Sequence, residues 1–105
     1  MEMKTCVGKN YTPEELTAIV GPLADAYNVT SVSVFGSRAT GEYTSTSDYD
    51  FLIDINSDFT FHDYCRFSDG LEEALGVPVD IVYRSTLDGD VFSRRVTKEA
   101  IRVWG

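Results

Sequence analysis

The stretch Val34-Phe35-Gly36-Ser37, followed after ten residues by Asp48-Tyr49-Asp50, decides the fold of this chain. Residues 29–35 are rich in β-branched side chains and alternate in character, which predicts a strand ending at Gly36. A short turn or helix should follow as far as Gly41. Residues 48–55 predict a second strand, because apolar side chains occupy its odd positions and carboxylates occupy positions 48, 50 and 54.

Outside this stretch, helices and strands are expected to alternate. The pattern predicts a helix from residue 13 to about residue 27, a helix at 61–75 closed by Gly76, a strand at 77–83, a short helix at 91–99 and an edge strand at 100–104. Thr12, Pro13 and Glu15 form a helix start with a capping box, whereas Pro22 should kink or break this helix. The alternation predicts an α/β or α+β fold with a mixed sheet.

Composition indicates one domain spanning residues 1–105, with residues 1–10 as a flexible N-terminal segment. Hydrophobic residues make up 43% of the chain, and no apolar run approaches the roughly 18 residues of a membrane span. The net charge of −8 disfavours stable binding to nucleic acid. Two widely separated cysteines and the lack of a signal-peptide core predict a reduced, cytoplasmic protein. The oligomeric state, including a homo-oligomer, stays open.

Asp48 and Asp50 carry the first chemical signal. Alternate strand residues share a face, so their β-carbons should lie about 6–7 Å apart. Two carboxylates at that spacing can hold one or two Mg²⁺ ions, with substrate phosphates completing the coordination. Taken alone, the pair could equally be a turn and a helix cap.

Asp80 interrupts an apolar strand and is the third candidate. If its strand lies in register beside the Asp48 strand, Asp80 joins the same cluster and could help to ligate the ion and activate an attacking hydroxyl. A buried carboxylate without a partner is costly, so this position favours a nearby cation. The alternatives are an edge-strand gatekeeper or an ion pair with Arg84.

Gly36 and Ser37 predict a phosphate-binding turn. Glycine lets the backbone approach a ligand closely, amides at a helix start point toward an anion, and the Ser37 hydroxyl adds a donor. Arg38 could donate to phosphate as well. An ordinary strand-ending turn is the alternative.

Arg94, Arg95 and Lys98 form a basic cluster that is typical of a solvated helix face, with contact to a partner or a triphosphate as the alternative.

These residues resemble a known family, the minimal nucleotidyltransferases of the DNA polymerase β superfamily. The signature of that family is Gly-Ser, ten residues and Asp-x-Asp, and residues 34–41 and 47–53 reproduce it here. Residues 78–82 are similar to the strand that bears the third carboxylate, and residues 99–105 to the terminal strand. The resemblance covers roughly residues 12–105 and implies a small mixed sheet flanked by helices, as in the polymerase β palm.

The resemblance also implies roles. Asp48, Asp50 and Asp80 would be the catalytic residues and would hold Mg²⁺. Nucleotide-binding residues would be Gly36, Ser37, Arg38 and Ser47. An acceptor hydroxyl would attack the α-phosphate of ATP, or of another nucleoside triphosphate, and release pyrophosphate.

Similar small proteins act as antitoxins that transfer AMP to a tyrosine of a helical HEPN-type toxin, which implies such a partner here. Many members carry a second basic residue where this chain has Thr40. Two other functions stay open at this point. One is a module that neutralises its partner by docking without catalysis, and the other is nucleotidyl transfer to a small-molecule hydroxyl.

Overall fold

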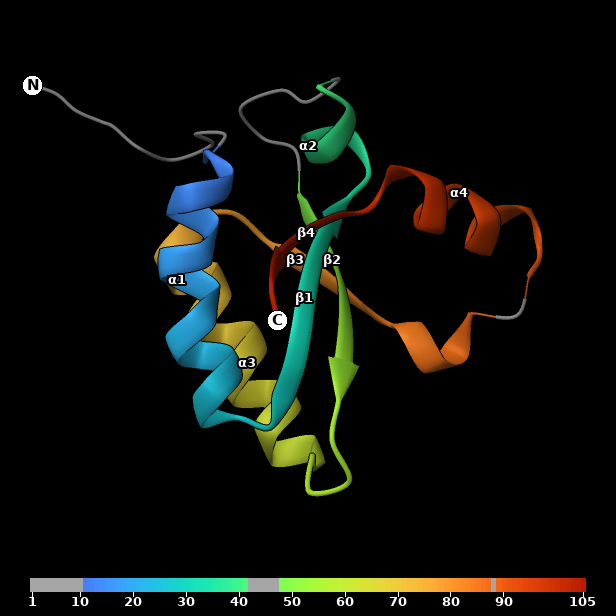
Figure 1. Ribbon diagram of the computed structural model, residues 1–105. Helices are drawn as coiled ribbons and strands as arrows, with labels where there is room; N and C mark the ends of the chain where they lie inside the picture. The colour runs from blue at the N-terminus through green and yellow to red at the C-terminus, as the bar shows by residue number, and fades with distance from the viewer. Residues whose placement is uncertain (1–10, 42–47, 88) are drawn as a thin grey trace, which may run out of the picture.

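The computed structural model describes residues 11–41, 48–87 and 89–105. Within these ranges, one four-stranded sheet is accompanied by helices on both faces (Figure 1). The elements in chain order are α1 (Pro13–Ala26), β1 (Val29–Phe35), α2 (Ser37–Thr40), β2 (Tyr49–Ile55), α3 (Phe61–Leu75), β3 (Val79–Tyr83), the 3₁₀ turn η1 (Arg84–Thr86), α4 (Val91–Glu99) and β4 (Ile101–Trp104).

The sheet is mixed, as the sequence predicts. Its strand order is β3-β2-β1-β4, with β1 antiparallel to both β2 and β4, and β2 parallel to β3. The α+β class is therefore confirmed. The third strand begins at Val79 rather than at residue 77, because Pro78 has no N–H to donate to a ladder. The second strand begins at Tyr49, which leaves Asp48 just before it.

The first helix starts as expected but does not break at its internal proline. Thr12 accepts a hydrogen bond from the Glu15 amide, and the Glu15 carboxylate accepts one from the Thr12 amide. The helix continues through Pro22 to Ala26 because its buried face packs on the sheet. Gly21 lies so close to Trp104 that an added β-carbon would come within 3.0 Å of the indole nitrogen.

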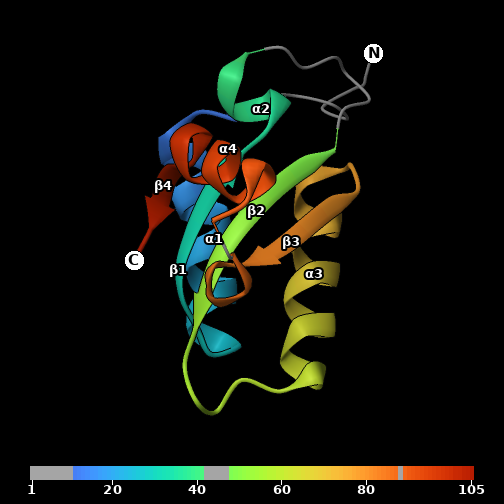
Figure 2. The ribbon, with the colours of Figure 1, turned by 90° about the vertical axis from the view of Figure 1, so that its right-hand side faces the viewer.

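The two faces of the sheet differ in what covers them. The main core lies between the sheet and the helices α1 and α3, and is formed by alternate strand residues such as Val32, Phe51 and Ile53. On the opposite face, Phe35 and Leu52 pack against Val96 of α4. Figure 2 looks onto this second face, with α4 in front of the strands and α2 at one end of the sheet.

None of the helices in the described ranges is both long enough and apolar enough to cross a membrane. The N-terminal segment 1–10, expected to be flexible, and Ser47 lie outside the described residues.

Candidate active site

Gly36 forms the turn that ends β1 and starts α2. Its backbone angles are φ 75° and ψ −156°, a combination that only glycine adopts without strain. A β-carbon at this position would also collide with Oδ2 of Asp50. Glycine is therefore required twice, once by the backbone and once by the carboxylate that lies against it.

Asp50 and Asp80 are brought side by side by strand pairing. Phe35 of β1 pairs with Asp50 of β2, and Asp50 pairs with Asp80 of the parallel strand β3. Leu52 and Val82, two residues further along, are partners in the same ladder. The sequence predicted that Asp80 joins the cluster only if its strand lies in register beside the Asp48 strand. The structure shows that register, with Asp80 opposite Asp50.

The environment of Asp50 shows that negative charge is crowded here. Burial raises the pKa of Asp50 from 3.8 to about 6, assisted by the charges of Asp80 and Asp48, a hydrogen bond with Asp80 and the charge of Glu99. Asp50 is half-buried, whereas Asp80 is exposed because β3 is an edge strand. The expectation of a buried carboxylate thus applies to Asp50 and not to Asp80.

Asp48, Asp50 and Asp80 offer the oxygen ligands that divalent cations such as Mg²⁺ prefer. In the described part of the chain, no group of three acidic, histidine or cysteine side chains is gathered closely enough to hold a metal ion by itself. After burial, the charges of Asp80 and Asp48 contribute most to the raised pKa of Asp50, and a nearby cation would offset that repulsion. Mg²⁺ is commonly held by one or two carboxylates together with substrate phosphates.

A pocket of about 300 Å³ opens beside the carboxylates. One side comes from the turn and strands, and the other comes from α4. The lining residues are Phe35, Gly36, Ser37, Asp50, Phe92, Arg95, Val96 and Glu99. The predicted phosphate turn and one predicted carboxylate therefore share a cavity. Helical spacing does not tell which part of a sheet a helix will cover, so the sequence offered contact of Arg95 with a triphosphate only as the alternative to a solvated helix face.

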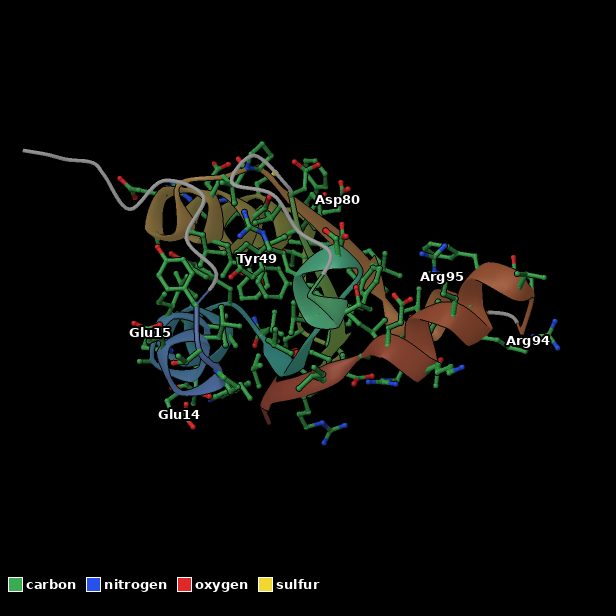
Figure 3. The ribbon with its side chains drawn as sticks, turned by 90° about the horizontal axis from the view of Figure 1, so that it is seen from above. Glu14, Glu15, Tyr49, Asp80, Arg94 and Arg95 are labelled. Carbon is green, nitrogen blue, oxygen red and sulfur yellow. The ribbon has the colours of Figure 1, made fainter. Side chains whose placement is uncertain are left out.

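Arg38 lies outside the pocket that contains Ser37 and Asp50. Its side chain is 4% exposed, and its guanidinium carbon is 4.7 Å from the centre of the Tyr49 ring. Tyr49 belongs to the core on the α1 and α3 face, and Figure 3 shows it turned toward those helices while Asp80 points away from them. The position of Arg38 indicates packing rather than the expected contact with phosphate.

Arg38→Met tests this assignment. We expect the free energy of unfolding to fall by about 1–2 kcal/mol, because the buried cation over the Tyr49 ring is lost while most of the packed volume is kept. The affinity for ATP should stay within about twofold of the parent value. Ser37→Ala is the matched control and should weaken ATP binding without loss of stability. Urea unfolding and calorimetric titration measure both quantities; weakened ATP binding by a fully stable Arg38→Met protein would contradict the assignment.

Arg84 does not pair with Asp80. Its Nε donates to Oδ2 of Asp54 over 3.0 Å, and the Ser31 hydroxyl donates to the same carboxylate. Burial raises the pKa of Asp54, but the hydrogen bonds from Ser31 and Arg84 and the Arg84 charge outweigh it, so the pKa lies below its ordinary value. Asp54 is therefore a structural carboxylate, although it lies on the same strand face as Asp50.

The sequence profile of the nucleotidyltransferase domain family matches residues 16–103. Protein adenylyltransferase MntA of Thermococcus cleftensis is 32% identical over 88 residues, which make up 84% of this chain and 88% of that relative. A candidate protein adenylyltransferase of Methanocaldococcus jannaschii is 32% identical over 83 residues, or 77% of this chain and 83% of that relative.

Solved structures are similar over most of the chain. A minimal nucleotidyltransferase has a TM-score of 0.72 at 34% identity, covering 89% of this chain and 97% of its own. A toxin–antitoxin structure with AMP-PNP has a TM-score of 0.68 at 20% identity, covering 85% and 73%. A tri-AMPylated HEPN toxin of Shewanella oneidensis in complex with its MNT antitoxin has a TM-score of 0.63 at 17% identity, covering 90% and 73%, so these last two share the fold alone. Since the profile spans most of its length and close relatives share its fold, this chain is a nucleotidyltransferase and belongs to the nucleotidyltransferase domain family.

Proposed function

We propose that this protein transfers AMP from ATP, in the presence of Mg²⁺, to a tyrosine hydroxyl of a HEPN-type helical toxin, and thereby acts as the antitoxin. The observation that carries the proposal is that Gly36, Asp50 and Asp80 meet at one end of the sheet, where Gly36 and Asp50 line a common pocket. The relatives support the same reading, since one is named a protein adenylyltransferase and two structural neighbours are toxin–antitoxin complexes.

The reaction replaces a phosphoanhydride bond of ATP with a phosphate ester bond to the acceptor. The acceptor oxygen forms a bond to the α-phosphorus of ATP, and the bond from that phosphorus to the oxygen bridging the β-phosphate breaks. Pyrophosphate leaves, and the hydroxyl proton passes to the carboxylate of Asp80. This residue suits the role because it is exposed on an edge strand, where the side chain of another protein can reach it.

The remaining residues hold the nucleotide. The turn at Gly36 and the Ser37 hydroxyl would bind the triphosphate, and Asp48, Asp50 and Asp80 would hold the divalent ion. When bound, Mg²⁺ supplies neutralisation of the charge that develops on the phosphates. The surface of the chain, with a net charge of −8, is complementary to a basic partner such as an RNA-cleaving protein.

Labelled ATP tests the proposal directly. The protein is incubated with α-labelled ATP, Mg²⁺ and the helical protein encoded beside it, and we expect label on a tyrosine of that partner. Asp80→Asn should lower the rate by about 100-fold or more, as removal of a group acting in proton transfer does. Asp54→Asn is the matched control, because this carboxylate lies on the same face but is held by Arg84; it should label the partner at the parent rate.

Two results would overturn the proposal. No transfer to the partner by the parent protein would exclude it. Equal toxin neutralisation by the parent and by Asp80→Asn would show that docking alone is sufficient.

A further inference from the structure

The pocket beside the carboxylates receives its positive charge from helix α4. A triphosphate keeps net negative charge when one Mg²⁺ is bound, so a further cation would stabilise it, but Arg38 is buried against Tyr49 on the other face. Among the described residues that line the pocket, Arg95 of α4 is the only basic one. Figure 3 shows Arg95 on the side of α4 toward Asp80, whereas Arg94 projects outward at the far end of the helix.

Arg95 is held in a way that a stronger anion can displace. Its Nε donates to Oε2 of Glu99 over 3.1 Å, one helical turn away, and the Arg95 side chain is 71% exposed. Exposed pairs of this kind are weak. In the described part of the chain this is the guanidinium's one hydrogen bond, so its terminal N–H groups can bind a phosphate in a bidentate manner. Glu99 is only 19% exposed and its charge reaches Asp50, so the pair borders the reaction site.

Phe92 provides an aromatic surface one helical turn from Arg95. Phe92 is 54% exposed, and its ring meets that of Phe35 edge-on, with centroids 6.5 Å apart and an interplanar angle of 81°. More than half of the Phe92 surface is therefore open to a ligand in the pocket. Stacking of a nucleobase on an aromatic face is favourable for every base. Val96 and Phe35 are apolar residues that line the same pocket.

We infer that α4 is the nucleotide-holding wall of this enzyme: Arg95 leaves Glu99 to bind the triphosphate, and Phe92 stacks on the base. The inference rests on the proposed function, because it assigns further groups to the same site. The grouping of these residues supports it. Gly36 and Ser37 of the predicted phosphate turn, Asp50, and Phe92 and Arg95 of α4 all line one pocket of about 300 Å³.

Calorimetric titration with a non-hydrolysable ATP analogue and Mg²⁺ tests the inference without any acceptor. Arg95→Ala should bind the analogue about tenfold more weakly, as expected for loss of charge-assisted hydrogen bonds, and should bind adenosine as the parent does. Phe92→Ala should bind the analogue and adenosine about tenfold more weakly, because stacking does not depend on the phosphates. Phe92→Leu, which keeps the apolar bulk, should show a similar loss if the ring face is what matters.

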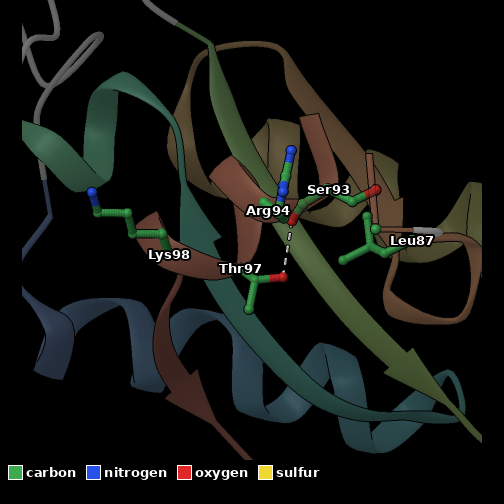
Figure 4. Close-up of a pocket in the computed structure, with 6 residues that line it drawn as sticks. Leu87, Ser93, Arg94, Thr97 and Lys98 are labelled. Atoms are coloured by element: carbon green, nitrogen blue, oxygen red, sulfur yellow. Dashed lines mark hydrogen bonds between the residues drawn. The ribbon is translucent and has the colours of Figure 1, made fainter. Parts of the chain in front are cut away.

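The neighbouring residues offer matched controls. Arg94 lines a separate pocket with Thr97 and Lys98, shown in Figure 4, and Val91 is 74% exposed without lining the active pocket. Arg94→Ala and Val91→Ala should therefore bind the analogue within about twofold of the parent value. Circular dichroism of each variant establishes that α4 is folded.

The outcomes separate this inference from the function itself. If the parent binds the analogue and labels the toxin, but Arg95→Ala and both Phe92 variants bind nucleotide normally, the inference is wrong and the function stands. If the Phe92 variants bind nucleotide normally yet lose affinity for the toxin, the wall holds the acceptor instead, which also overturns the inference. If the parent neither binds the analogue nor labels the toxin, both fail.

Discussion

Replacing Gly36 with alanine should lower the rate of nucleotide transfer by at least about 100-fold. The added methyl group collides with Oδ2 of Asp50, so the carboxylate must move out of its position between Gly36 and Asp80. Displacements of about 1 Å at a reacting centre cost rates of this size. Backbone strain at φ 75° and ψ −156° should also lower the free energy of unfolding by about 1–3 kcal/mol.

Gly41→Ala is the matched control for Gly36→Ala. Gly41 closes the other end of α2 with φ 90°, and a β-carbon there would meet no atom of the described residues within 4 Å. Alanine at this position should lower stability by about 1 kcal/mol through strain alone and leave transfer per folded molecule unchanged. Rates measured with labelled ATP at saturating acceptor, together with urea unfolding, compare the two variants. Equal activity of both variants would show that the space beside Asp50 is not needed.

Asp50→Asn should abolish transfer and yet make the protein more stable at neutral pH. Loss of the half-buried carboxylate removes the central group of the proposed metal site, and we expect the rate to fall by about 1,000-fold. The same change removes a charge that is desolvated and repelled by Asp80, Asp48 and Glu99. Active sites often trade stability for function in this way.

The stability gain should depend on pH in a defined direction. The folded state raises the pKa of Asp50 from 3.8 to about 6, so it holds this proton more tightly than the unfolded state does. The resulting stabilisation of the parent protein is complete below about pH 4 and is lost as the pH rises through 6. Asparagine does not titrate, so Asp50→Asn should gain about 1 kcal/mol over the parent at pH 8, after allowance for solvent screening, and almost nothing at pH 4.

Asp54→Asn serves as the control, because it should lower the free energy of unfolding at pH 8 where Asp50→Asn raises it. The pKa of Asp54 is lowered, because the hydrogen bonds from Ser31 and Arg84 outweigh the effect of burial. This carboxylate stabilises the fold at neutral pH, and its contribution fades as the solution is acidified. Urea unfolding at pH 4 and pH 8 distinguishes the two variants. An Asp50→Asn protein less stable than the parent at pH 8 would contradict the crowding of charge at this site.

The elements of this fold were predictable where the signal is local. The capping box of Thr12 and Glu15 and the C-terminal glycine Gly76 each involve residues within one helical turn, and they mark the helix ends in the structure. The strand alternation around Asp50 is equally local, because neighbouring side chains point to opposite faces. Boundaries shifted by only one or two residues, at Tyr49 and Val79, where a ladder partner or Pro78 decides the first hydrogen bond.

The candidate site was predictable only in part. The spacing of Gly36, Ser37, Asp48 and Asp50 lies within a single strand–turn–strand unit, so its members could be grouped in advance. The direction in which the Arg38 side chain points could not be predicted. It follows from the backbone angles of Gly36 and from the space under the Tyr49 ring. Asp54 illustrates the same limit, since its role is decided by Arg84, thirty residues away.

The sequence by itself determined the reaction class, because the Gly36-Ser37 turn and the paired carboxylates Asp48 and Asp50, which make up the family signature, are close in the chain. Tertiary structure decided which other groups join them. Parallel pairing of β2 with β3 places Asp80 beside Asp50, and packing of Val96 on Phe35 and Leu52 places α4 over the pocket. Such placements depend on contacts between segments distant in the chain, and the energy of burying their apolar faces selects them.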